Sequence, residues 1–411
     1  MIIHHVRRTI SFFLLGAASG AVAGLAAFVL LESLDRVTEW RIENSWLVWL
    51  LPVGGLVVGA AYHWLGGRGR GGTALAVSEA HAYTTGSPAR MAPLVFVGTV
   101  VGHLVGACIG REGVAVQMSS SITDAGARLF RLDHDHRAML ARAALAGGFG
   151  AVFGVPLAGL VFATEVARRR TVRAVAASVP AAFVGDAVVR ALGRSHDYLP
   201  HISVPFDVGA AVGLIVGGLI IGLVARLFAA VVPAAKALTA QHVPWPWLRP
   251  ALGGAVTLAL VGMVGRDYLG LSIPLLNHAL AGDHINSWQP ALKLLFLIVA
   301  LASGFVGGEV TPLFVTGATL GSVLAGPLAV APTTMASLGL AALFGAAAHV
   351  PLTCAVMAAE LFGASALVPA LVVCLCARAV AGRTSIYEHD LSEAAMREWA
   401  PTSGGPQTNP A

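Results

Sequence analysis

The chain has 411 residues, of which 56% are hydrophobic and only 11% are charged, and its mean hydropathy is +0.77. Because soluble domains carry about 25% charged residues, this composition excludes a soluble protein and indicates an integral membrane protein that lies in a lipid bilayer. The formal net charge of +5 does not indicate a nucleic-acid partner, since the basic residues are spread over loops and termini, as membrane topology predicts.

Apolar segments that approach the roughly 20 residues needed to span a bilayer recur along the chain. The N-terminal segment has the charge pattern of a signal peptide, but its apolar run continues to Leu31, so we interpret it as the first membrane helix. Several later segments are too short, or too interrupted by glycine and proline, to be simple spans. The predicted spans are 9–31, 46–65, 91–109, 138–165, 207–235, 250–266, 291–306, 311–330, 333–349 and 351–381, with 171–193 as a weaker candidate.

The polar segments between these spans are short. Arg168, Arg169 and Arg170 are interpreted as a cytoplasmic anchor, and 236–249, which holds two tryptophans, as an interfacial connector. The tail 388–411 is predicted to be disordered. The four cysteines lie in apolar runs without a CxxC pair, so we predict no metal site and no cofactor.

An internal repeat divides the chain. FGAVFGVPLAGLVFATEV begins at Phe149 and FGAAAHVPLTCAVMAAEL begins at Phe344, an offset of 195 residues. GRE at 110–112 and GGE at 307–309 match at an offset of 197. Two matches at nearly one offset indicate homologous halves, 1–200 and 201–387. Repeated halves with glycine-interrupted helices are typical of secondary transporters, whose ligand site lies where the halves meet.

Glu112 is the strongest candidate functional residue, because a carboxylate in a membrane segment is costly and usually functional. Gly110 and Gly113 flank it, and a helix starting at about Gly113 would present unpaired N–H groups and the positive end of its dipole to an anion. Glu112 could occupy this site as a tethered anion, or protonate and leave it. The alternative is a structural role, in which Glu112 pairs with Arg111 or with the backbone at the helix start.

The repeat places GGEVTP, 307–312, at the matching position of the second half. Proline in the first turn of a helix is a start signal, so a second helix N-terminus is expected to face the first. The N–H groups of Gly113, Val114 and Ala115, and those of Val310 and Thr311, are therefore the predicted anion contacts.

These motifs together resemble the CLC family of chloride channels and anion/proton antiporters. GREGV is similar to the family's GREGP signature, GGEVTP stands where the family has GxFxP, and SIYEHD supplies Tyr387 at the place of its anion-coordinating tyrosine. The resemblance covers about residues 10–390. It implies an all-α polytopic membrane protein with a CLC-type fold of two inverted-topology repeats with tilted and broken helices, assembled as a homodimer in the cell membrane. Glu112 falls on the gating glutamate.

Departures from the family pattern narrow the expected activity. GGTALAVSEAH, 71–81, replaces the GSGIP signature, so Thr73 stands where chloride-type members have serine, although its GGRGRGGT context could be only a loop. GGEVTP, with Glu309 and Thr311, resembles the fluoride/proton antiporter branch. Val166 stands where chloride/proton exchangers carry an internal glutamate, so Glu309 becomes a candidate for coupling protons to anions.

The predicted function is export of fluoride in exchange for protons, with Glu112 as gate and proton carrier. The alternative is a chloride, other halide or nitrate channel, or a chloride/proton antiporter, of the same family. Anion contacts are expected from Thr73, Arg111 and Tyr387 besides the helix starts. An enzyme is not expected, because the sequence has no Ser-His-Asp constellation, no HExxH and no phosphate-binding loop.

Four other ionisable residues in apolar segments are interpreted as structural. Glu165 and Glu360 occupy matching ends of the repeated helices, where they are expected to bond to backbone at helix termini. His103 and His349 are expected to be hydrogen-bonded packing residues, with a proton relay as the alternative.

Overall fold

The computed structural model describes residues 2–167, 172–194, 200–202 and 207–387, which are built from α-helices and short 3-10 helices. The cytoplasmic anchor predicted at Arg168, Arg169 and Arg170 and the tail predicted at 388–411 lie outside these described residues. The expected all-α fold is confirmed, since the described part of the chain contains no strand and only an isolated β-bridge.

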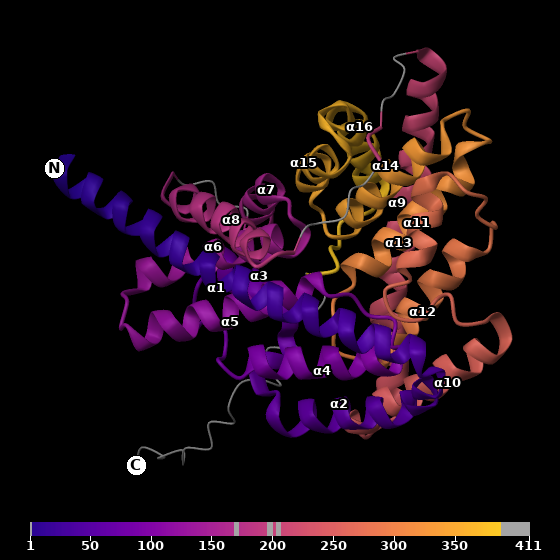
Figure 1. The fold of residues 1–411 in the computed structure, drawn as a ribbon, viewed down its shortest axis with the longest axis horizontal. Helices are drawn as coiled ribbons and strands as arrows, with labels where there is room; N and C mark the ends of the chain where they lie inside the picture. The colour runs from indigo at the N-terminus through magenta and orange to yellow at the C-terminus, as the bar shows by residue number, and fades with distance from the viewer. Residues whose placement is uncertain (1, 168–171, 195–199, 203–206, 388–411) are drawn as a thin grey trace, which may run out of the picture.

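The same order of helices occurs twice, and Figure 1 shows the first set in indigo to magenta and the second in magenta to yellow. The first set is α1 (Ile2–Glu43), α2 (Leu51–Leu65), α3 (Gly72–His81), α4 (Met91–Val105), α5 (Glu112–Leu129), α6 (His134–Phe153), α7 (Pro156–Val166) and α8 (Val172–Ala191). The second set is α9 (Val208–His242), α10 (Arg249–Val264), α11 (Ile273–Ala281), α12 (Gln289–Ser303), α13 (Val310–Ala325), α14 (Pro332–Ala347), α15 (Pro351–Phe362) and α16 (Leu367–Val380). The 3-10 helices are η1 (Ser45–Leu50), η2 (Gly67–Gly71), η3 (Pro246–Leu248) and η4 (Ala364–Ala366).

Corresponding helices begin at corresponding motif positions. α5 begins in GRE and α13 directly after GGE, while α7 and α15 both begin at the proline of VPL. The repeat found in the sequence is thus a repeat of structure. The division of the chain at residue 200 stays a prediction.

Five described segments are long and apolar enough to cross a membrane, by length and composition alone: Ile10–Glu43, Ser45–Leu65, Ala174–Ala191, Val208–His242 and Pro246–Val264. The stretch 171–193, expected to be a weak candidate, is therefore a full-length one. Most of the other apolar helices are shorter, which fits the expected fold of broken helices that meet inside the protein.

Three predicted elements differ from the structure. The span 138–165 is two helices, because Gly154 ends α6 in a left-handed conformation with φ of 70° and α7 starts at Pro156. The span 351–381 is likewise broken into α15 and α16 at Gly363, with φ of 97°. The connector predicted at 236–249 is much shorter, since α9 continues to His242.

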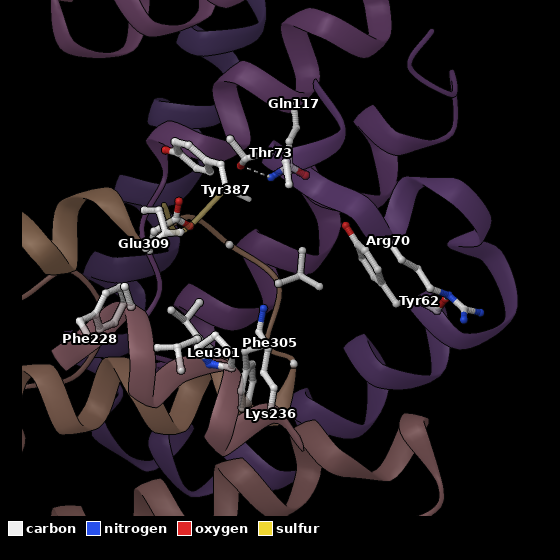
Figure 2. A pocket seen from close by; sticks show the side chains of 18 residues that line it. Tyr62, Arg70, Thr73, Gln117, Phe228, Lys236, Leu301, Phe305, Glu309 and Tyr387 are labelled. Carbon is white, nitrogen blue, oxygen red and sulfur yellow. Dashed lines mark hydrogen bonds between the residues drawn. The ribbon is translucent and has the colours of Figure 1, made fainter. Parts of the chain in front are cut away.

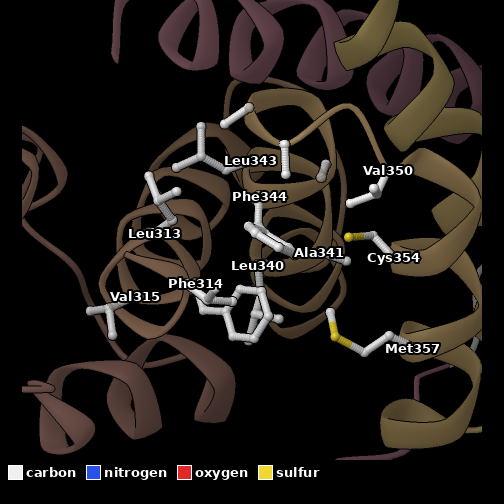
Figure 3. Packing of buried hydrophobic residues seen from close by; sticks show 14 of the residues in the cluster. Leu313, Phe314, Val315, Leu340, Ala341, Leu343, Phe344, Val350, Cys354 and Met357 are labelled. Atoms are coloured by element: carbon white, nitrogen blue, oxygen red, sulfur yellow. The ribbon is translucent and has the colours of Figure 1, made fainter. Parts of the chain in front are cut away.

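The core of the second half lies between α13, α14 and α15. Figure 3 shows Leu340, Ala341 and Phe344 of α14 inserted between Phe314 of α13 and Met357 of α15. Phe314 and Phe344 meet edge to face with ring centroids 5.7 Å apart. This packing fixes the direction of α13, whose N-terminus carries the GGEVTP motif.

Glu165 and Glu360 join the two halves at reciprocal helix ends, which confirms the structural interpretation of both. Glu165, at the end of α7, accepts hydrogen bonds from the N–H groups of Leu352 at 3.1 Å and Thr353 at 2.8 Å, and from the Thr353 hydroxyl at 2.7 Å, at the start of α15. Glu360 in α15 accepts from the N–H groups of Leu157 at 3.0 Å and Ala158 at 2.7 Å, at the start of α7. Each carboxylate thus caps the other helix.

Replacing Glu165 by alanine is expected to destabilise the protein by about 1–3 kcal/mol, because it leaves the first N–H groups of α15 without acceptors. The measurement is the thermal unfolding midpoint of the purified protein in detergent. Glu32→Ala is the matched control, since Glu32 is half-buried and forms ion pairs with Arg36 and Arg194 but accepts no hydrogen bond from a helix start. An equal midpoint for the two variants would contradict the capping role.

Candidate functional site

Glu112 is the first residue of α5, and only 2% of its surface is exposed. Its carboxylate reaches the start of α13, where the Thr311 N–H donates to Oε2 at 3.1 Å and the Thr311 hydroxyl donates to Oε1. The backbone N–H of Arg111 donates to Oε2 at 3.2 Å, and the side-chain Nε of Arg111 lies 3.5 Å from Oε1. The pairing with Arg111 and the occupation of a helix N-terminus therefore occur together, and the Glu112 carboxyl group lies at the start of α13 in this structure.

Two short segments bring the starts of α5 and α13 together. The Gly308 N–H donates to the Gly110 carbonyl at 2.8 Å, and the Gly110 N–H donates to the Gly308 carbonyl. A Cβ on Gly308 would lie 3.0 Å from the Gly113 nitrogen, and a Cβ on Gly307 would lie 2.5 Å from the Ile109 Cβ. The glycines of both motifs therefore allow two backbones to approach closely.

Replacing Gly307 by alanine is expected to lower the unfolding midpoint and the transport rate together. The added methyl must displace Ile109 or separate the two segments, and such overpacking costs about 1–3 kcal/mol. The measurements are the unfolding midpoint in detergent and anion efflux from liposomes. Gly326→Ala is the control, because nothing lies within 4 Å of a Cβ there. A Gly307→Ala protein as stable as the control would contradict the close approach.

Thr73 connects the start of α3 to α5. The GGRGRGGT stretch is not simply a loop, because Gly67–Gly71 forms η2 and α3 begins at Gly72. The Thr73 hydroxyl accepts a hydrogen bond from Gln117 Nε2 at 3.0 Å and donates to the Gly113 carbonyl at 3.5 Å. The residue expected at the anion path therefore lies one hydrogen bond from the first turn of the Glu112 helix.

A cavity of about 320 Å³, here named the Thr73 cavity, opens beside this contact. Glu309 and Tyr387 lie together on one wall, close enough for a side-chain hydrogen bond, as Figure 2 shows. Glu112 is not a lining residue. The polar residues that line the cavity come from both halves of the chain; they are Tyr62, Arg70, Thr73, Gln117, Lys236, Glu309 and Tyr387.

A second cavity, here named the Arg41 cavity, has a volume of about 750 Å³. Arg41, Arg111 and Arg266 line it, together with Asp35 and Asp267. Arg111 connects this cavity to Glu112, since it contacts the Glu112 carboxyl group and also lies 3.7 Å from Asp35. Glu112 lines neither cavity, but its two neighbours in the chain contact them: Gly113 accepts a hydrogen bond from Thr73 of the first cavity, and Arg111 lines the second.

The structure brings most of the predicted site residues together, but some line a cavity and others are buried at the helix starts. Glu309, Thr73 and Tyr387 line the Thr73 cavity, and Arg111 lines the Arg41 cavity. Gly113, Val114, Val310 and Thr311 are buried at the two helix starts, with the Val114 side chain in an apolar cluster. The Ala115 N–H donates to the Arg111 carbonyl at 3.1 Å, so it is engaged within the helix, and its expected contact with an anion stays a prediction.

Sequence reasoning missed four polar residues of the Thr73 cavity, namely Tyr62, Arg70, Gln117 and Lys236. Gln117 lies one turn after Gly113, so helical spacing could have placed it beside the motif. Lys236 is a cation in a long apolar helix, which is a functional signal in membrane proteins. Tyr62 offered no comparable signal.

By the family resemblance, Val166 is expected to stand where chloride/proton exchangers carry an internal glutamate. Val166 lines a third cavity of about 240 Å³, together with His81, His349 and Tyr387. The neighbouring carboxylate of Glu165 is engaged by α15. His103 is fully buried in α4 and hydrogen-bonds through Nδ1 to the Thr99 carbonyl at 2.9 Å, as expected for a packing residue.

Comparison with known proteins identifies the family. A model described as "Voltage gated chloride channel" matches residues 66–382. A "Chloride/fluoride channel protein" of Pseudomonas syringae pv. tomato is 38% identical over 376 residues, covering 89% of this chain and 83% of the relative. An "H(+)/Cl(-) exchange transporter ClcA" of Vibrio vulnificus is 26% identical, covering 85% of this chain and 81% of the relative.

Solved structures agree with the sequence relatives. A "CLC-type fluoride/proton antiporter" matches with a TM-score of 0.88 at 29% identity, covering 93% of this chain and 98% of that structure. A "slow cyanobacterial Cl-/H+ antiporter" has the same fold, with a TM-score of 0.77 at 20% identity, covering 96% of this chain and 99% of that structure. The chain is therefore a membrane protein of the voltage-gated chloride channel family, the CLC family, whose members are anion transporters and channels rather than enzymes.

Proposed function

We propose that this chain exports fluoride in exchange for protons, with Glu112 as both gate and proton carrier. The observation that carries the proposal is the Glu112 carboxylate held at the start of α13 by Thr311, next to a cavity whose wall holds Glu309 and Tyr387. The likeness to a fluoride/proton antiporter and to a chloride/fluoride channel protein supports the choice of anion.

The proposed mechanism is competition between a tethered carboxylate and a free anion. The N–H and hydroxyl groups of Thr311 favour a negative charge, so an ionised Glu112 holds its place at the start of α13. Protonation removes that charge, and the neutral acid gives up the site to a fluoride ion. Fluoride passing in one direction and a proton passing in the other on Glu112 then belong to one cycle.

Glu309 is proposed to pass protons between the Thr73 cavity and Glu112. Chloride/proton exchangers are expected to use a carboxylate at the place of Val166, and this chain has none there, while Glu165 is held as a helix cap. Glu309 lies on the cavity wall two residues before Thr311, the residue that binds the gate. Its position supports a proton path different from that of the chloride branch.

A chloride channel or chloride/proton antiporter is the second candidate function. It is favoured by the names of two relatives, a chloride/fluoride channel protein and an H(+)/Cl(-) exchange transporter. Thr73 also offers a hydroxyl where the chloride-type members are expected to have serine. In this case Thr73 would coordinate chloride as that serine does.

The deciding experiment is anion efflux from liposomes that hold the purified protein, with fluoride and chloride compared and external pH recorded. Fast fluoride efflux, little chloride efflux and proton uptake support the fluoride/proton proposal. Chloride efflux as fast as fluoride efflux would favour the second candidate, and fluoride efflux without proton uptake would contradict proton exchange.

We also propose that the protein is a homodimer in the cell membrane, with one anion path in each subunit. Large apolar side chains lie exposed on helices that pack close to one another, among them Leu157 of α7, Phe183 of α8, Leu352 of α15 and Val368 of α16. The test is the mass of the detergent-solubilised protein by light scattering. A single 42.0 kDa chain in the micelle would contradict the dimer.

A further inference from the structure

Tyr62 lies near the end of α2 and lines the Thr73 cavity. Its ring packs beside Gly98, where an added Cβ would lie 3.5 Å from Cε2. Its hydroxyl oxygen is buried and has no hydrogen-bond partner among the residues that the structure describes. A buried hydroxyl without a partner is destabilising, so its presence calls for an explanation.

The hydroxyl points into the cavity. Figure 2 shows it directed toward the Thr73–Gln117 hydrogen bond, from the side opposite Glu309 and Tyr387. Thr73 is already engaged by Gln117 and by the Gly113 carbonyl, so it supplies no ready partner. The partner of the Tyr62 hydroxyl is therefore expected among the contents of the cavity.

The chemistry of the wall indicates what those contents are. A phenol donates one hydrogen bond, and donors suit an anion. Arg70 and Lys236 also line the cavity, but the Arg70 guanidinium is turned away from it and donates to the backbone carbonyls of Tyr62 and His63, as Figure 2 shows. Lys236 is therefore the cationic group that accompanies the phenol in the cavity. A small anion is attracted to the side of the cavity that holds Lys236, away from Glu309, and can accept a hydrogen bond from the phenol.

We infer that Tyr62 donates a hydrogen bond to the transported anion in the Thr73 cavity and helps to select fluoride over chloride. The inference rests on the proposed function and adds a specificity-determining residue to it. Fluoride is the smaller ion, so its charge lies closer to the donor hydrogen and the bond is stronger. Loss of this one donor therefore weakens fluoride binding more than chloride binding.

The test is Tyr62→Phe, which keeps the ring against Gly98 and removes only the hydroxyl. The half-saturating fluoride concentration for efflux from liposomes is expected to rise about tenfold, as for the loss of one hydrogen bond to a charged group, and the fluoride-to-chloride rate ratio is expected to fall. The unfolding midpoint in anion-free detergent buffer is expected to stay the same or rise, because an unpartnered polar atom has been removed. If Tyr62 had only a structural role, the variant would instead have a lower unfolding midpoint and the wild-type anion dependence.

Tyr83→Phe is the matched control. The Tyr83 hydroxyl donates to Asp124 at 2.6 Å and lies outside the Thr73 cavity, so this variant is expected to lose stability and keep the wild-type fluoride dependence. An unchanged fluoride dependence and selectivity in Tyr62→Phe would overturn the inference, and so would a lowered unfolding midpoint with unchanged anion dependence.

A failure of the proposed function can be told apart from a failure of this inference, because it is seen in the wild-type protein. The wild-type protein would then show fluoride efflux without proton uptake, or no efflux. In that case the inference is tested by the shift of the unfolding midpoint on titration with sodium fluoride and sodium chloride in detergent. A smaller fluoride-dependent shift in Tyr62→Phe than in wild type supports it. Equal shifts overturn it.

Discussion

Replacing Glu112 by glutamine is expected to abolish proton uptake during fluoride efflux while the protein stays folded. Glutamine has nearly the same shape, but its amide does not titrate. It is also a poorer occupant of the site, since it is neutral and one end of it is a donor that faces the donors of Thr311. The lost charge-assisted hydrogen bonds correspond to about 1.5–3 kcal/mol, so the gate is expected to open more readily and anion efflux to change in rate.

The measurement is simultaneous recording of external fluoride and pH with liposomes that hold the wild-type or the variant protein. Glu360→Gln is the control, because it changes a carboxylate that caps a helix and does not line the Thr73 or the Arg41 cavity. The control is expected to keep the wild-type ratio of protons to fluoride. Wild-type proton movement in Glu112→Gln would rule out Glu112 as the proton carrier.

Replacing Glu309 by glutamine is expected to lower fluoride turnover by roughly a hundredfold, the low end of what a positioned proton-transfer group contributes. Glu309 precedes α13 directly, lies on the wall of the Thr73 cavity beside Tyr387, and stands two residues before Thr311, which binds Glu112. Glutamine keeps the hydrogen-bonding shape but cannot accept a proton. The rate is read as initial fluoride efflux at saturating internal fluoride.

Glu360→Gln again provides the comparison, since it is expected to lower the unfolding midpoint but leave turnover within about twofold of wild type. Equal losses of turnover in the two variants would show that Glu309 acts on the fold rather than on proton transfer. The proton path would then have to be sought among the groups around Val166.

The meeting of Glu112 with the start of α13 could be predicted from the sequence, because two motifs and one rule were sufficient, while its role as a gate stays a proposal. GREGV and GGEVTP each mark a helix start, helix starts bind anions, and the repeat places the two starts face to face. The structure adds the specific contact, from the Glu112 carboxylate to the N–H and hydroxyl of Thr311. Thr73 and Tyr387 came only from the family resemblance, because neither stands in a pattern that predicts chemistry.

The rest of the site depends on packing between distant segments. Tyr62 and Lys236 face one cavity from α2 and α9, and no local pattern of either helix predicts that meeting. The helix breaks at Gly154 and Gly363 were also missed, because mean hydropathy over a window stays high across a broken helix. Each break is nevertheless marked in the sequence by a glycine, and Gly154 also by Pro156 two residues later. A glycine with positive φ is a backbone property that hydropathy does not report.

During synthesis α7 enters the membrane long before α15 exists. Glu165 and its partner Thr353 are 188 residues apart, and at about 5–20 residues per second the ribosome needs roughly 10–40 s to supply that length. In this interval a carboxylate at the end of α7 and two N–H groups at its start have no partners from the second half. Half-made chains therefore present polar groups to lipid, and the membrane insertion machinery has to shelter α7 until α15 arrives.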